Sequence, residues 1–185
     1  MWIALYAFAG IVGLVVLFVV VLAIIASQRP VDFRLTRQAA MAAPPAAAFE
    51  QVNDFHNWDN WSPWAKLDPN MTVTHAGPSA GVGASYAWTG NGKVGQGRME
   101  IKESRPGELV RIELQFLKPF KATNEAEFTF RPEGGKTLVT WAMTGKMNLP
   151  MRMFGVLMNM DKAVGKDFEK GLAALKATVE GDRAG

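Results

Sequence analysis

The sequence predicts an α+β fold, with one folded domain behind a single apolar helix. Three observations support this prediction. The first 26 residues contain no charged residue and no histidine, asparagine or glutamine. Much of the chain after them alternates apolar and polar residues with the period of half-buried strands. Residues 150–179 then form an amphipathic helical pattern. A sheet with one apolar face must be covered, and a helix lying across it is the simplest cover.

Residues 1–27 are expected to be a transmembrane anchor, because a bilayer-spanning helix needs about 20 apolar residues. A cleaved signal peptide would begin with basic residues and have an apolar core of about 7 to 15 residues. No basic residue precedes this longer run, so an uncleaved single-pass helix is the better interpretation. The flanking arginines, Arg29, Arg34 and Arg37, favour a cytoplasmic domain under the positive-inside rule. A periplasmic or external domain stays open as the alternative.

A short polar linker, residues 28–32, follows this helix, and Pro30 in it opposes continuation of the helix. Residues 33–179 are long enough for a single core, and residues 180–185 are expected to form a flexible tail. The net charge is only +3, and basic residues alternate with acidic ones. This pattern argues against nucleic-acid binding. The chain has no cysteine, which excludes disulfides and thiolate metal sites.

The domain is expected to begin with a strand at residues 33–41, followed by a short helix that Pro44 and Pro45 open. Turn-forming pairs such as Asn91-Gly92 separate the alternating runs that come next. In the clearest runs one face is apolar and the other polar, which is typical of an antiparallel sheet with one buried face. The six further predicted strands are residues 71–76, 84–89, 94–104, 109–116, 122–131 and 137–145.

Residues 150–179 are predicted to form a long closing helix, about 45 Å in length if continuous. Asp161 falls on its apolar stripe. A carboxylate that faced an apolar cavity would be costly unless paired, and it could exchange a proton with a ligand carbonyl. The alternative is an edge carboxylate that pairs with a basic side chain. The stripe itself is Phe154, Leu157, Met158, Val164, Phe168, Leu172, Leu175 and Val179.

No motif in the sequence supports a catalytic or metal site. His56 and His75 do not stand at a metal-ligand spacing with a second ligand. No serine occupies a nucleophile-elbow pattern. Residues 90–95 match G-x-G-x-x-G, but they lie between two predicted strands and not before a helix, so they are interpreted as a hairpin. No cofactor is expected.

Four stretches of the domain carry a family resemblance. They are AAPPAAAFEQVNDFHNWDNWSPW, GVGASYAWTGN followed by GQGRMEIKESRPGELVRIEL, PFKATNEAEFTF with TLVTWAMTG, and MNMDKAVGKDFEKGLAALK. Together they resemble the START-like, helix-grip superfamily, also called SRPBCC proteins, and within it the bacterial polyketide cyclase/dehydrase-like branch. The resemblance covers residues 33–178. It implies a seven-stranded antiparallel sheet that grips the C-terminal helix around an apolar cavity, which periodicity alone does not show.

The branch carries a Phe-x-x-Trp-x-x-Trp-x-Pro-Trp pattern after its first helix, and here it reads Phe55, Trp58, Trp61, Pro63 and Trp64. A spacing of three stacks side chains along one edge of a 3₁₀-like segment. This ridge is interpreted either as a hydrophobic plug at one end of the grip or as part of the ligand entrance. Different tryptophans can serve the two roles.

The candidate ligand-binding residues are inward-facing positions of the strands and the closing helix, together with part of the tryptophan ridge. Methionine and aromatic side chains suit an adaptable apolar pocket. The favoured function is a membrane-tethered domain that binds a hydrophobic small molecule, such as a lipid, isoprenoid or polyketide-like compound. The alternatives are a polyketide cyclase/dehydratase-like enzyme and an interaction module without a ligand. The candidates are Trp61, Trp64, Tyr86, Trp88, Met99, Ile112, Leu114, Phe116, Asn124, Phe128, Trp141, Met143, Phe154, Met158 and Asp161.

Overall fold

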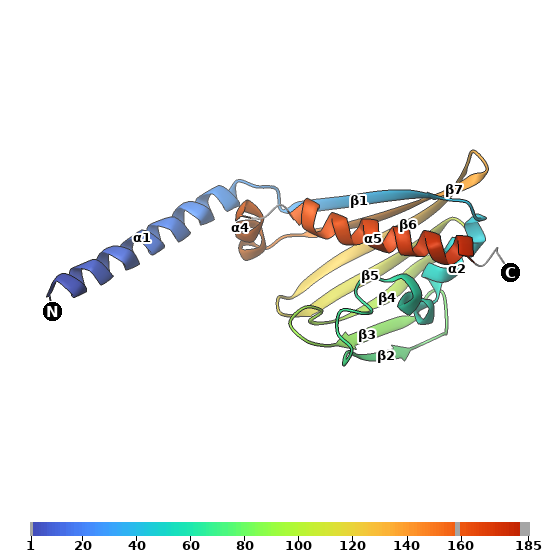
Figure 1. Cartoon of the computed structure of the whole chain (residues 1–185), viewed down its shortest axis with the longest axis horizontal. Helices are drawn as coiled ribbons and strands as arrows, with labels where there is room; N and C mark the ends of the chain where they lie inside the picture. Colours follow the sequence, from blue (N-terminus) through green and yellow to red (C-terminus); the bar gives the residue numbers. More distant parts are fainter. Residues whose placement is uncertain (1, 158–159, 182–185) are drawn as a thin grey trace.

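The computed structural model describes residues 2–157 and 160–181 of the chain. Seven antiparallel strands form one layer, and helix α5 (Met160–Gly181) lies along it (Figure 1). A second long helix, α1 (Trp2–Ser27), projects away from this body (Figure 1). The predicted α+β, helix-grip class is therefore confirmed.

The sheet has the order β1-β7-β6-β5-β4-β3-β2, so sequential strands are neighbours except β1, which pairs with the last strand. Each strand begins and ends within two residues of its predicted range. Their bounds are β1 (Asp32–Met41), β2 (Thr72–Ala76), β3 (Ser85–Thr89), β4 (Gln96–Arg105), β5 (Leu109–Lys118), β6 (Ala122–Glu133) and β7 (Lys136–Lys146). The alternation along these strands assigns one face to the core and the other to solvent.

Three short helices connect β1 to β2. They are α2 (Pro45–Asn53), η1 (Phe55–Asn57) and α3 (Trp58–Trp61). Pro45 occupies the first turn of α2, where its missing N–H leaves no hydrogen bond unmade. Asp54 caps η1, because its carboxylate accepts a hydrogen bond of 2.9 Å from the backbone N–H of His56. Helix α2 contacts both α5 and the sheet, so this segment bridges the two layers.

In the C-terminal region the structure describes two helical segments, α4 (Leu149–Leu157) and α5, and residues 158 and 159 between them lie outside the described residues. In α4, Phe154 and Leu157 are 50% and 60% exposed, so this part of the predicted stripe is not core. The reason is that α4 packs against α1, and a spacing of three and four does not reveal which neighbour a helix meets. In α5 the stripe is buried at Phe168, Leu172, Leu175 and Val179.

Candidate ligand-binding cavity

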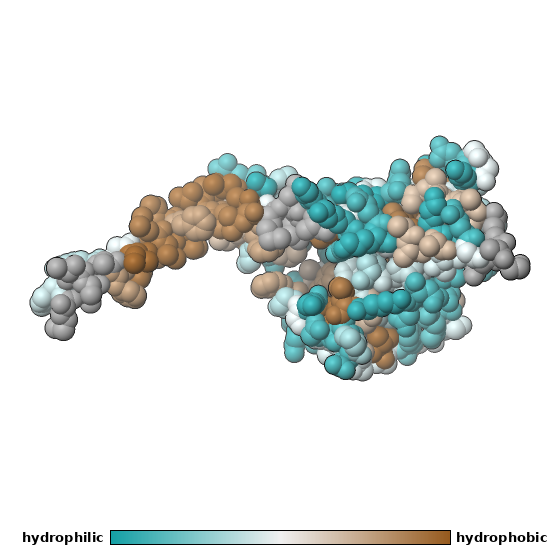
Figure 2. Space-filling model, viewed as in Figure 1, coloured by the Kyte–Doolittle hydropathy of each residue, from teal (hydrophilic) through white to brown (hydrophobic). Residues whose placement is uncertain are grey.

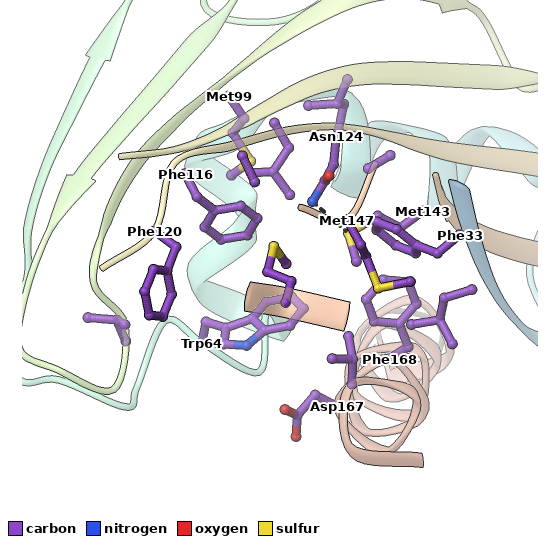
Figure 3. Close-up of a pocket in the computed structure, with 18 of the residues that line it drawn as sticks. Phe33, Trp64, Met99, Phe116, Phe120, Asn124, Met143, Met147, Asp167 and Phe168 are labelled. Atoms are coloured by element: carbon purple, nitrogen blue, oxygen red, sulfur yellow. Dashed lines mark hydrogen bonds between the residues drawn. The ribbon is translucent and has the colours of Figure 1, made fainter. Parts of the chain in front are cut away.

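A cavity of about 810 Å³ lies between the sheet and the helices, within the range of roughly 300 to 1,000 Å³ that is usual for small-molecule sites. Figure 3 shows aromatic and methionine side chains from opposite sides turned toward its centre. Strands β3 to β7 supply one wall, and α3, α4 and α5 supply residues to the other. The inward strand positions are apolar because alternation places every second side chain on this face.

Most of the predicted site residues that the structure describes line this cavity, and three of them do not. Trp61 and Phe128 are 2% and 0% exposed and lie behind the cavity wall, in the core. Phe154 is exposed on α4, away from the cavity, and Met158 lies outside the described residues. Those at the cavity are Trp64, Tyr86, Trp88, Met99, Ile112, Leu114, Phe116, Asn124, Trp141, Met143 and Asp161.

Sequence reasoning missed part of the cavity wall. Phe33 and Leu35 line it from β1, and Met147 and Met151 line it before and within α4. Figure 3 places Phe33 and Met147 on the side of the cavity where Met143 lies. The alternation of Phe33 and Leu35 did indicate burial, but only the pairing of β1 with β7 brings them to the same cavity as Met143.

The tryptophans of the ridge have two roles: Trp58 and Trp61 are held against α2, and Trp64 forms part of the cavity wall. The indole N–H groups of Trp58 and Trp61 donate to backbone carbonyl oxygens of α2, at 3.0 Å to Val52 and 3.1 Å to Gln51. These bonds hold the ridge against α2 and satisfy two otherwise buried donors. Trp61 is packed into the core, whereas Trp64 is only partly buried and faces the cavity (Figure 3).

Trp141 joins the sheet to α5 through a stack of rings. Its ring lies on Phe168 with centroids 3.9 Å apart and planes at 13°, and on Phe128 at 4.8 Å and 28°. Trp64 meets Trp141 edge-on at 5.8 Å and 90°. The stack fixes the distance between the sheet and α5 at one end of the cavity, so the cavity is kept open by packed rings and not by loose packing.

Two buried polar side chains, Asn124 and Tyr86, lie on the cavity wall. Asn124 is 6% exposed, and its amide Nδ2 donates to the sulfur of Met143, at 3.9 Å. Tyr86 is 7% exposed. Burial, aided by the negative charge of Asp59, raises the pKa of the Tyr86 hydroxyl to about 12. This phenol therefore stays protonated at neutral pH and can donate a hydrogen bond.

Asp161 lies at the rim of the cavity and pairs with Arg37. The two side chains approach to 3.2 Å, and the Asp161 side chain is 66% exposed. Arg37 also meets Glu169 at 2.8 Å. The hydrogen bonds that the Arg37 guanidinium donates to Asp161 and then to Glu169 raise its pKa. The observed arrangement is thus the edge pairing, and Asp161 is not a desolvated proton donor inside an apolar cavity.

The two histidines lie apart from this site. Their rings, His56 and His75, stack with centroids 4.1 Å apart, and Asp54 contacts His56 at 2.7 Å. Over residues 2–157 and 160–181, no three side chains of metal-ligating type come together.

The sequence of residues 32–180 matches the protein family described as polyketide cyclase / dehydrase and lipid transport. The chain belongs to this family. The description names polyketide cyclases, dehydrases and lipid transport, which is consistent with the apolar cavity. No match was found among curated protein sequences.

Solved structures share the fold at low sequence identity. Protein SA2116 from Staphylococcus aureus has a TM-score of 0.62 and 12% identity, over 83% of this chain and 97% of that one. Protein CV1439 from Chromobacterium violaceum has a TM-score of 0.57 and 17% identity, over 82% and 99%. The di-domain ARO/CYC StfQ of the steffimycin biosynthetic pathway has a TM-score of 0.62 and 13% identity, over 84% of this chain and 52% of that protein. These likenesses show the fold alone.

Proposed function

We propose that this protein is a membrane-tethered domain that binds a hydrophobic small molecule, such as a lipid, isoprenoid or polyketide-like compound, between the sheet and α5. The observation that carries the proposal is the cavity of about 810 Å³ with its aromatic and methionine walls. Burial of a ligand's apolar surface in this cavity favours binding by about 25 cal/mol for each Å² removed from water. Membership of a family described by cyclases, dehydrases and lipid transport supports the same class of ligand.

The tether is supported by the exposure of α1. Its segment Phe8–Ser27 is long and apolar enough to cross a membrane. Among the α1 side chains that the structure describes, only Leu22 and Ala26 are buried and Ala23 is half-buried, so the other described side chains are exposed. Figure 2 shows this apolar surface running along α1, beside a domain whose visible face is mostly polar. A bilayer would cover α1 and hold the cavity beside a reservoir of poorly soluble ligands.

The test is to purify the full chain in lipid nanodiscs, extract it with organic solvent, and compare the extract with empty nanodiscs by mass spectrometry. The matched variant is Ala126→Trp, because Ala126 lies on the cavity wall of β6. The control is Ala177→Trp at an exposed position of α5. A compound enriched with the wild type and with Ala177→Trp, and lost with Ala126→Trp, is expected. Equal extracts from all three proteins would refute ligand binding in the cavity.

A further inference from the structure

The Asn124 amide is a buried polar group with almost no partner. An asparagine amide can make four hydrogen bonds. Here the only one is the weak contact to Met143 sulfur, and Oδ1 is buried with no hydrogen-bond partner among the described residues. Such a group costs stability unless something bonds to it.

The backbone makes room for this amide. Asn124 on β6 faces Gly145 on β7, and Gly145 also faces Phe33 on β1. A Cβ at Gly145 would collide with Asn124 Oδ1. The absence of a side chain at this position therefore lets the amide lie against β7, and Figure 3 shows it pointing toward the centre of the cavity.

The surroundings of the amide select a neutral partner. Apolar and sulfur-bearing side chains, Phe33, Leu114 and Met143, line the cavity beside it, and a bare charge among them would be costly. Resting on the proposed ligand binding, we propose that the guest carries a neutral hydrogen-bonding group, a hydroxyl or a carbonyl, that bonds to the Asn124 amide. The site then favours an apolar molecule with an internal oxygen over a pure hydrocarbon.

The test compares two probes of nearly equal shape, 2-naphthol and 2-methylnaphthalene, against the full chain in nanodiscs. The variant is Asn124→Leu, and the control is Met99→Leu at an apolar position of the same wall. We expect Asn124→Leu to weaken the binding of 2-naphthol about fivefold to tenfold, which is the effect of losing one neutral hydrogen bond. Binding of 2-methylnaphthalene should not weaken. Met99→Leu should change the affinity for both probes by the same factor.

A second measurement does not depend on the variant. In wild-type protein, the signal of the ¹⁵N-labelled side-chain amide of Asn124 should shift further with 2-naphthol than with 2-methylnaphthalene, because the two probes share the same ring current and only 2-naphthol forms the hydrogen bond. Equal losses of affinity for the two probes in Asn124→Leu, or equal shifts of the amide signal with the two bound probes, would overturn the inference. Failure of both probes to bind the wild type would instead refute the proposed ligand binding itself.

A separate observation concerns α4, which has two different faces. One face is held to the end of α1: Arg152 Nη1 donates to the carbonyl oxygens of Ser27 and Arg29, at 3.3 and 3.1 Å, and Arg29 Nη1 donates to that of Gly155, at 3.4 Å. A cation at this place also suits the negative end of the α1 dipole. The same face lines the cavity, with Met151, Arg152, Gly155 and Val156.

The other face of α4 is exposed and apolar. Leu149, Phe154 and Leu157 are 39%, 50% and 60% exposed. The buried residues of α1, Leu22 and Ala26, lie near its C-terminal end. At 1.5 Å per residue, Leu22 is about 7.5 Å from the last residue of α1. If α1 spans a bilayer, α4 is therefore at the boundary between headgroups and acyl chains.

From this geometry we infer that α4 lies in the membrane interface, with Phe154 and Leu157 among the acyl chains, and that it separates the bilayer from the cavity. This inference rests on the proposed tether. Arg29 and Arg34 are exposed beside the cavity, where they suit anionic lipid headgroups. A membrane-dissolved ligand would then pass α4 to reach the cavity without crossing bulk water.

Because the chain has no cysteine, single cysteines can report depth in vesicles that contain an anionic lipid. An environment-sensitive fluorophore is attached at Phe154→Cys, at Val19→Cys in α1, and at the exposed Ala177→Cys of α5. Brominated lipids should quench the labels at 154 and 19 and leave the label at 177 unquenched. Quenching at 19 without quenching at 154 would overturn the interfacial position of α4 alone. No quenching at 19 would overturn the tether and this inference together.

Discussion

Truncation of Phe168 tests the ring stack that holds the sheet and α5 apart. Phe168 is 1% exposed, stacks on Trp141 at 3.9 Å, and meets Trp64 edge-on at 6.2 Å. Phe-to-Ala changes in cores cost about 3 to 5 kcal/mol, and this includes ring contacts worth about 0.5 to 1.5 kcal/mol. Because Phe168 also borders the cavity, the new void merges with existing space and cannot close. We expect Phe168→Ala to lower the free energy of unfolding by about 4 kcal/mol.

The assay is urea unfolding of the full chain in mild detergent, followed by tryptophan fluorescence. A loss of about 4 kcal/mol is a large part of the roughly 5 to 15 kcal/mol that stabilises an ordinary domain. The matched control is Phe154→Ala, the same change at a side chain that is 50% exposed, which should stay within about 0.5 kcal/mol of wild type. Equal losses in the two variants would refute the assignment of the stack as the support of the cavity.

Two further predictions concern β4 and β3. A Cβ at Gly97 would collide with the Trp88 ring and with a backbone carbonyl oxygen of β5 at 2.6 Å. Gly97→Ala should therefore lower the free energy of unfolding by about 1 to 3 kcal/mol, seen as a lower midpoint in urea. The control Gly92→Ala, where the added Cβ meets open space, should leave the midpoint unchanged. The Tyr86 hydroxyl should ionise near pH 12 in a Tyr6→Phe background, followed by absorbance at 295 nm. Tyrosine in the unfolded chain ionises near pH 10. The contribution of Tyr86 to the free energy of unfolding is therefore fully present below about pH 10 and is lost as the pH rises toward 12. Ionisation of Tyr86 near pH 10 in the folded chain would contradict its burial.

The local elements could be predicted from the sequence because their signals are local. Alternation along each strand, proline at the start of α2 and glycine pairs in turns depend on neighbours in the chain. The apolar run of α1 is equally visible, since no polar residue interrupts it. The family resemblance added the grip of the sheet on the C-terminal helix, and with it most of the inward positions that line the cavity.

Only the tertiary structure decided which inward positions meet the cavity and which lie behind it. Trp61 and Trp64 have the same spacing in the ridge, yet one is core and the other is wall, because the depth of each depends on α2 and Trp141. The packing of α4 on α1 also escaped the pattern, since it is a contact between distant parts of the chain. Periodicity reports that a side chain is buried; the partner that buries it is fixed by long-range packing, which no local pattern contains.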